Sequence, residues 1–356
     1  MTENRLRILP FFAALCIGLC GCASIGPRRL EGDQLQYSTA ILEAQKRQIL
    51  LNIVRIRYGD APTFLSVNQV IAGYTLEQAA ELGLNVYPNA RPGNFATGLS
   101  RLSLEDRPTI TFAPLSGEQL ARASARPLAP ASLLPVAQGA MPIDVLFRLA
   151  VQSIGSLQNT VALAGEEGAG DPRFFELLAG MRHLQVRGLL TVRVVNGKNS
   201  NHVFLGIADG SDPDTRAVAA RTRRLLGMLP HATEAEVVYG RVAPSPGKIA
   251  ILTRPIVGIL GQVSAEIEVP SEDIAAGRTI FTFPFSRLGQ SPIIRVHSGR
   301  TEPANTDTAV RYGQIWFWID DRDFNSKIAY TLLGFLIALA QGTPAGQAPV
   351  LTIPAG

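Results

Sequence analysis

Cysteine is scarce in this chain of 356 residues: only three occur, and all of them fall within the first 22 positions. A disulfide framework and a cysteine-based zinc site are therefore excluded from the rest of the chain. No run of about 20 uncharged apolar residues occurs either, which excludes a protein with several transmembrane helices. With 46% hydrophobic residues and a net charge of only +4, the composition also excludes a chain that is disordered throughout.

Familiar catalytic and nucleotide-binding motifs are missing as well. The sequence holds no Gly-x-Ser-x-Gly, no His-Glu-x-x-His, no Walker loop and no Gly-x-Gly-x-x-Gly. The four histidines are far apart in sequence, so a zinc site would require the fold to bring them together. We therefore expect no cofactor, and a non-enzymatic role is favoured.

The N-terminal segment has the layout of an export signal. Two arginines precede an apolar stretch from residue 8 to 19, and the letters LCGC at 19–22 end this segment. A basic start followed by roughly 7–15 apolar residues is typical of a signal peptide, and LCGC resembles the lipobox of bacterial lipoproteins. The resemblance implies a signal peptide at 1–21 and lipidation of Cys22 with acyl chains such as palmitate. The alternative is an uncleaved anchor or a buried N-terminal helix.

Lipidation predicts a location at the bacterial cell envelope. Each buried methylene contributes about 0.8 kcal/mol, so several acyl chains hold a protein durably on a bilayer. Ala23 follows Cys22, and the absence of an aspartate there favours the outer membrane, with the chain facing the periplasm. The expected partners are this membrane and an envelope protein. Export and scattered positive charge argue against nucleic acid.

Apolar spacing along the mature chain predicts a mixed α+β fold around one or two cores. We expect a lipidated N-terminus and tether at 22–36, a globular region at 37–340 with a sub-boundary near 160–188, and a tail rich in Pro, Gly and Ala at 341–356. Helices are expected at 37–58, 143–157, from 171 onward, and at 212–229, 255–263 and 324–340. Strands are expected at 64–75, 108–112, 279–285, 293–297 and 314–319, antiparallel hairpins at 189–207 and 237–253, a loop at 83–107 and a proline-broken stretch at 126–139.

Four sequence blocks resemble a family of uncharacterised proteobacterial lipoproteins. The blocks are LLNIVRIRYGDAPTFL (50–65), RPTITFAPLSGEQLAR (107–122), PIDVLFRLAVQSI (142–154) and WFWIDDRDFNSK (316–327). They span most of the mature chain, so the resemblance implies an exported, lipid-anchored protein of this organisation. It implies no activity, ligand or catalytic residue. Met141 departs from the family pattern, in which a larger aromatic residue is expected.

The acidic segment around residue 320 is the strongest candidate for chemistry. Three of its residues match the first ligand positions of a calcium loop, but the sixth and twelfth positions hold Ser and Leu in place of Gly and Glu. An EF-hand is therefore excluded. A looser metal site remains open at Asp320, Asp321 and Asp323 with His297. The alternative is that an aspartate caps the following helix while its neighbours are solvated or pair with Arg322.

Two pairs of arginines are candidates for binding an anion or a protein partner. Arg55 and Arg57 lie at the end of an expected helix and suit a carboxylate or phosphate; the alternative is that they stabilise the negative end of that helix. Arg221 and Arg224 belong to a basic helix suited to anionic headgroups or an acidic partner. The alternative for this helix is a solvated face.

Two functional hypotheses follow from these patterns. The leading one is a membrane-anchored, periplasm-facing lipoprotein that acts as a non-enzymatic binding or assembly subunit of the cell envelope. The alternative is an envelope hydrolase, metal-assisted, that uses the aspartates near 320–323. A cleft in which those carboxylates converge with His297 would favour the hydrolase.

Overall fold

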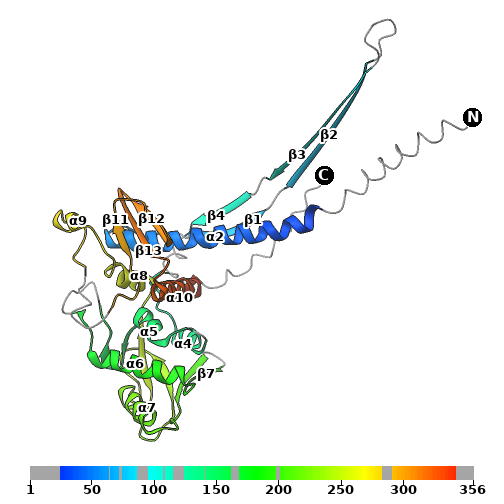
Figure 1. Cartoon of the computed structure of the whole chain (residues 1–356). Helices are drawn as coiled ribbons and strands as arrows, with labels where there is room; N and C mark the ends of the chain where they lie inside the picture. The colour runs from blue at the N-terminus through cyan, green and yellow to red at the C-terminus, as the bar shows by residue number, and fades with distance from the viewer. Residues whose placement is uncertain are drawn as a thin grey trace, which may run out of the picture.

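The chain has a mixed α+β fold, as predicted (Figure 1). The computed structural model describes residues 25–63, 65–71, 74–85, 95–106, 109–114, 124–139, 141–161, 168–197, 201–282 and 291–341. Side chains are described for 35–63 and for the ranges from 124 onward. The expected signal peptide, Cys22 and nearly all of the expected tail lie outside the described residues.

Helix α2 (Ile25–Arg57) is one continuous helix of 33 residues. Its C-terminal half lies against the body, and its N-terminal half extends past the body in Figure 1. The helix expected at 37–58 is confirmed, and it begins earlier, at Ile25, within the segment 22–36 that was expected to be a tether. Pro27 lies in the first turn, where a missing N–H is tolerated, and several good helix formers follow. Apolar periodicity did not reveal the N-terminal part of this helix, and Leu35, its first residue with a described side chain, is 65% exposed.

An arm of paired strands projects from the body beside α2 (Figure 1). Strand β1 (Leu65–Ile71) pairs antiparallel with β4 (Thr109–Pro114). Strand β2 (Tyr74–Asn85) pairs antiparallel with β3 (Phe95–Asp106). The strands expected at 64–75 and 108–112 are confirmed in β1 and β4.

The two ladders of the arm share one register. Ile71 of β1 pairs with Thr109 of β4, and three positions further along the chain Tyr74 of β2 pairs with Asp106 of β3, so the same register continues from one ladder into the other. The loop expected at 83–107 is therefore wrong, because most of it belongs to strands. Its Gly and Asn residues have low strand propensity, and the prediction missed the cross-strand hydrogen bonds that outweigh that propensity.

The lower part of the body in Figure 1 is built on a six-stranded sheet of order β6–β5–β10–β9–β8–β7. Its strands are β5 (Val151–Ile154), β6 (Leu157–Gln158), β7 (Leu190–Asn196), β8 (Asn201–Ile207), β9 (Glu234–Tyr239) and β10 (Ile249–Thr253). Packed on the sheet or on one another are α4 (Pro130–Gln138), α5 (Ile143–Ala150), α6 (Pro172–Val186) and α7 (Pro213–Leu225). The β7–β8 hairpin and the starts of α6 and α7 are confirmed.

Three predictions made from local sequence differ from the structure in this part of the body. The helix expected at 143–157 ends at Ala150, because β5 joins the sheet beside β10. Strands β9 and β10 run parallel rather than as a hairpin, and residues 240–248 carry the chain back to the start of the ladder. The proline-broken stretch at 126–139 contains α4, whose Pro130 occupies a first-turn position.

The upper part of the body holds a three-stranded antiparallel sheet of order β11–β13–β12. Its strands are β11 (His297–Gly299), β12 (Thr306–Tyr312) and β13 (Ile315–Asp320), and its helices are α8 (Ile256–Ser264), α9 (Ser271–Ala275) and α10 (Phe324–Gln341). Helices α8 and α10 and strand β13 are confirmed, while β12 and α9 were not expected. Residues 279–282 and 293–296 are not strand, and 283–285 lie outside the described residues.

One hydrophobic core joins both parts of the body. Phe317 of β13 and Leu205 of β8 belong to the same cluster of buried side chains, which also includes Ile53 of α2 and Leu333 of α10. The expected sub-boundary near 160–188 therefore does not separate two cores. In the portion of the chain that is described, no helix combines the length and apolar character needed to span a bilayer.

Candidate functional site

A groove of about 480 Å³ lies between helices α2 and α10. Its walls are largely apolar, with Leu42 of α2 60% exposed and Phe335 of α10 56% exposed. The groove has no histidine or cysteine in its lining, and its charged groups are Glu43 and Lys46. It offers apolar contact rather than acid–base chemistry.

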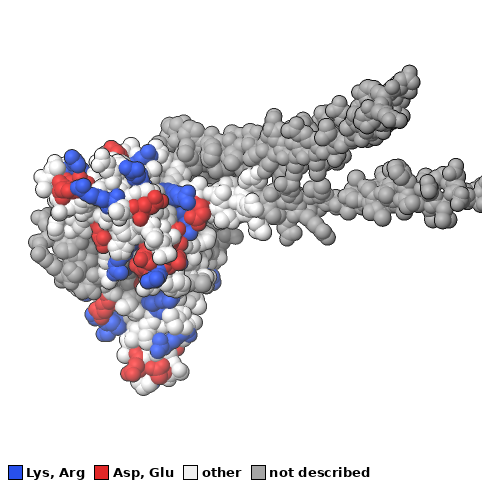
Figure 2. All heavy atoms as spheres, turned by 45° about the horizontal axis from the view of Figure 1, so that its top comes forward, with Lys and Arg blue, Asp and Glu red and all other residues white. Residues whose placement is uncertain are grey.

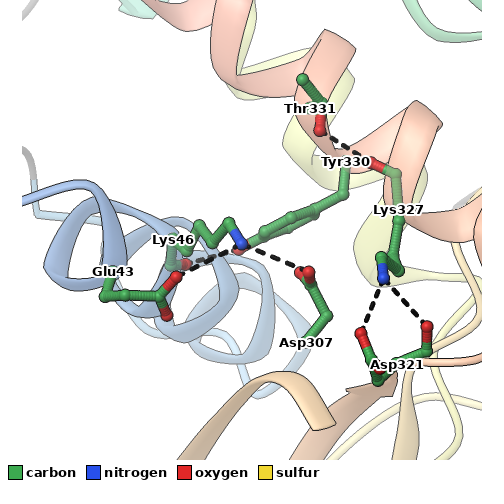
Figure 3. Close-up of polar contacts among 7 residues, drawn as sticks. All are labelled: Glu43, Lys46, Asp307, Asp321, Lys327, Tyr330 and Thr331. Carbon is green, nitrogen blue, oxygen red and sulfur yellow. Dashed lines mark hydrogen bonds and ion pairs between the residues drawn. The ribbon is translucent and has the colours of Figure 1, made fainter. Parts of the chain in front are cut away.

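Polar contacts at the edge of this groove hold α2 against the body (Figure 3). Lys46 Nζ lies 3.4 Å from Glu43 Oε1 on its own helix and 3.2 Å from Asp307 Oδ1 on β12. The Tyr330 hydroxyl of α10 donates to the backbone carbonyl of Lys46. Burial raises the pKa of Tyr330 well above its usual value, so this hydroxyl stays a donor.

The aspartates around residue 320 serve separate structural tasks. Asp320 Oδ1 accepts from Arg322 N at 2.8 Å, and Asp321 Oδ1 pairs with Lys327 Nζ at 2.6 Å (Figure 3). Asp323 caps helix α10, since its Oδ1 accepts from Ser326 N at 3.1 Å. Burial opposes ionisation of Asp323, but the Ser326 N–H and hydroxyl outweigh it and hold its pKa below the usual range.

His297 does not join these aspartates in a metal site. Its Nδ1 lies 3.1 Å from Glu268 Oε2, and its ring packs on Trp318 with 5.7 Å between centroids. Across the described ranges no group of three or more His, Cys, Asp or Glu side chains is placed to hold a metal ion. The structure of this segment therefore matches the alternative prediction, in which an aspartate caps the helix that follows.

Arg55 and Arg57 point to different places, so they do not form a joint clamp. Arg55 Nη1 donates to Thr63 Oγ1 at 2.5 Å. Arg57 is buried at 4% exposure and donates to backbone and hydroxyl oxygens of residues 264–282. Of these two candidates, Arg57 is the one with an unusual environment.

Two of the four arginines of helix α7 are paired with acidic neighbours. Arg221 makes a two-pronged ion pair with Glu176 of α6, at 2.7 and 2.9 Å, and Arg223 pairs with Asp209 at 2.7 Å. Arg224 is exposed. Figure 2 shows acidic and basic side chains interspersed on the visible face, so that face presents no patch of a single sign.

Sequence analysis missed a buried polar network beneath α5. Arg254 donates to the carbonyls of Arg148, Leu149 and Thr160, and Asn159 Nδ2 donates to those of Phe147, Arg148 and Val151 at 2.6–3.3 Å. Glu266 is also buried here, and burial raises its pKa. The residues next to Arg254 and Asn159 in sequence do not indicate that these polar side chains are buried, so the sequence contained no sign of this network.

No family model, curated protein or solved structure matches this chain.

Proposed function

We propose that this protein is a lipid-anchored, periplasm-facing subunit of the bacterial cell envelope, and that it acts by assembly with copies of itself rather than by catalysis. The export pattern and the lipobox-like LCGC sequence at 19–22 support the anchor, with Cys22 as the acceptor. Ala23 favours the outer membrane. The absence of familiar catalytic motifs in the sequence supports a non-enzymatic role.

Helix α2 would act as a strut between the anchor and the body. It begins three residues after Cys22 and continues without a break to Arg57. At 1.5 Å per residue, its 33 residues extend about 50 Å. The contacts of Lys46 and Tyr330 hold its C-terminal half on the body, so the acyl chains would sit at the far end of a rigid rod.

The observation that carries the assembly proposal is the arm. In the described strands, β1–β4 and β2–β3 are two-stranded, so each strand has one edge that pairs with no other strand. Strands of 12 residues extend about 40 Å. An isolated two-stranded hairpin is marginally stable in water, and unpaired strand edges are templates for pairing with another chain. Copies of the arm lying edge to edge would satisfy these backbone groups in a shared sheet.

Shortening the arm tests this proposal. Because Ile71 and Thr109 are paired neighbours, residues 72–108 are replaced by an Asn-Gly turn that closes β1–β4 as a short hairpin. Native mass spectrometry of the detergent-extracted full chain should give an oligomer, and the shortened chain should give a monomer with an unchanged thermal midpoint for the body. A monomeric parent chain, or a shortened chain that still forms the oligomer, would contradict the proposal. Recovery of the parent chain with a different protein instead of itself would also contradict it.

A further inference from the structure

Arg57, the last residue of α2, is a buried cation whose partners are all neutral. Its Nη1 donates to Ser264 O at 3.2 Å, and its Nη2 donates to Ile280 O and Thr282 Oγ1, each at 2.8 Å. Only 4% of the residue is exposed. Buried charges in proteins are ordinarily paired, because removing a charge from water is costly.

Part of the hydrogen-bonding capacity of Arg57 is unused. Its Nε is buried and has no partner in the described part of the chain. Burial lowers the pKa of Arg57 to about 10, the Tyr58 hydroxyl opposes this shift only in part, and no carboxylate of the described residues contributes. The other two deeply placed arginines, Arg148 and Arg254, both lie in the field of the buried Glu266. Arg57 therefore differs from them in having no carboxylate counter-charge among the described residues.

A hollow of about 290 Å³ lies beside Arg57. Gly59 and Gly277 line it with positive φ angles of 81° and 67°, and a Cβ at either position would meet open space. Both glycines follow a helix, Gly59 after α2 and Gly277 after α9, so the hollow lies where the C-terminal ends of these two helices meet.

A second arginine lines the same hollow. Arg278 donates through Nη1 to Asp273 Oδ1 at 2.9 Å, while its side chain stays 69% exposed. The Tyr58 hydroxyl donates to the other oxygen of Asp273 at 2.7 Å. Both oxygens of Asp273 are thus taken up by Arg278 and Tyr58 and neither bonds to Arg57, so the described surroundings of the hollow hold two guanidinium groups and one carboxylate.

We propose that this hollow binds an oxyanion, a phosphate or carboxylate group, between Arg57 and Arg278. The buried Arg57 would supply the uncompensated charge, and the exposed Arg278 would close over the entrance with its remaining N–H groups. Arginine suits this task because its planar fork matches both anions. A bound anion would also supply the counter-charge that Arg57 lacks among the described residues.

Thermal unfolding of the full chain in detergent tests the site, with inorganic phosphate as the first probe and acetate as the second. Chloride at matched ionic strength is the reference. Phosphate or acetate should raise the unfolding midpoint beyond the chloride reference, and the probe that acts at lower concentration identifies the preferred anion. If neither anion stabilises the protein beyond chloride, the proposal is overturned.

Two matched variants assign the effect to the hollow. Arg278→Gln should raise the anion concentration needed for half of the stabilisation by about fivefold, as expected for loss of a charge-assisted hydrogen bond. Arg300→Gln is the control, because Arg300 is similarly exposed at 73% and pairs with a carboxylate, Glu272, and neither of these residues lines the hollow. Equal effects of the two variants would show general charge screening and overturn the proposal. Arg57→Lys, where it folds, should lose most of the anion response.

Discussion

Asn159 and Arg254 donate to carbonyl groups around the C-terminal end of helix α5: Arg148 O accepts from both side chains, and Leu149 O accepts from Arg254. Three carbonyls accept from Asn159 Nδ2, and Val151 O is the closest at 2.6 Å. Both side chains are buried, at 3% and 5% exposure, so water cannot take over these bonds.

Replacing Asn159 by Leu should therefore lower the free energy of unfolding by about 2–3 kcal/mol, because buried carbonyls lose their donor. Urea titration of the parent and variant proteins measures the difference. Asn201→Ala, at an exposed position of β8, is the control and should change the value by less than about 0.5 kcal/mol. A small effect of Asn159→Leu would mean that α5 does not depend on this contact.

Glu236 gives a pH dependence with a defined sign. The Lys248 ammonium at 2.7 Å and the His202 ring at 2.7 Å hold the pKa of Glu236 below its ordinary value of 4.5. The folded state therefore binds fewer protons than the unfolded state in this window, and stability is lost as pH falls below 4.5 toward the folded pKa.

Glu236→Gln should accordingly reduce the loss of unfolding free energy between about pH 5 and about pH 3. Chemical denaturation at several pH values measures this slope. Glu302→Gln serves as the control, because Glu302 pairs with no cation in the described ranges, and it should leave the slope unchanged. An acid dependence identical in all three proteins would contradict the role of Glu236.

At the scale of elements, helix α10 begins directly after Asp323, the residue that caps it. Asp323 accepts from Ser326 N three residues later, the arrangement of a helix N-cap, and Ser326 Oγ donates to its second oxygen at 2.8 Å. Arg295 Nη1 lies 3.7 Å from the same oxygen. Both oxygens of the Asp323 carboxylate therefore have protein partners.

Asp323→Ala should destabilise the protein by about 1 kcal/mol, the usual value for loss of a cap. Thermal denaturation followed by circular dichroism measures the change. Asp321→Ala is the neighbouring control, because it removes only an exposed ion pair with Lys327, and its effect should be clearly smaller. Stabilisation of the parent protein by calcium, lost in Asp323→Ala, would instead support the metal site that the sequence left open.

At the scale of the whole molecule, the proposed anchor, strut and arm form one arrangement. The free end of α2 and the arm both extend beyond the body in Figure 1. Arms of several copies would then lie close to one another when their Cys22 residues are held in the same membrane leaflet. Confinement to a surface raises the effective concentration of the arms and favours their pairing.

Cys22→Ser tests the anchor by itself. The variant should leave the membrane fraction and migrate differently on electrophoresis, because it can neither be acylated nor processed at this position. Membrane fractionation of the parent and variant proteins measures the change, and Cys20→Ser is the matched control. Unaltered fractionation and mobility of Cys22→Ser would contradict lipidation, whatever the arm does.

Local chemistry was sufficient to predict several elements of this protein. Asp-Pro at 171–172 and 212–213 marks the starts of α6 and α7, because aspartate accepts from first-turn N–H groups and proline needs no donor there. The apolar face of α5 and the apolar run of α10 were likewise visible in the residue spacing. These features depend on residues within a few positions of one another.

Tertiary contacts decided the rest. The arm, the parallel pairing of β9 with β10 and the early end of α5 depend on backbone hydrogen bonds between strands, which outweigh weak local propensities. The same holds for the arginines: Arg55 and Arg57 are two positions apart, yet one meets Thr63 at the surface and the other is buried beside a hollow. The sequence by itself determined which residues could carry a charge or cap a helix. The energy of each charged side chain depends on its burial and on its distance to a counter-charge, and only the tertiary structure decided these two quantities.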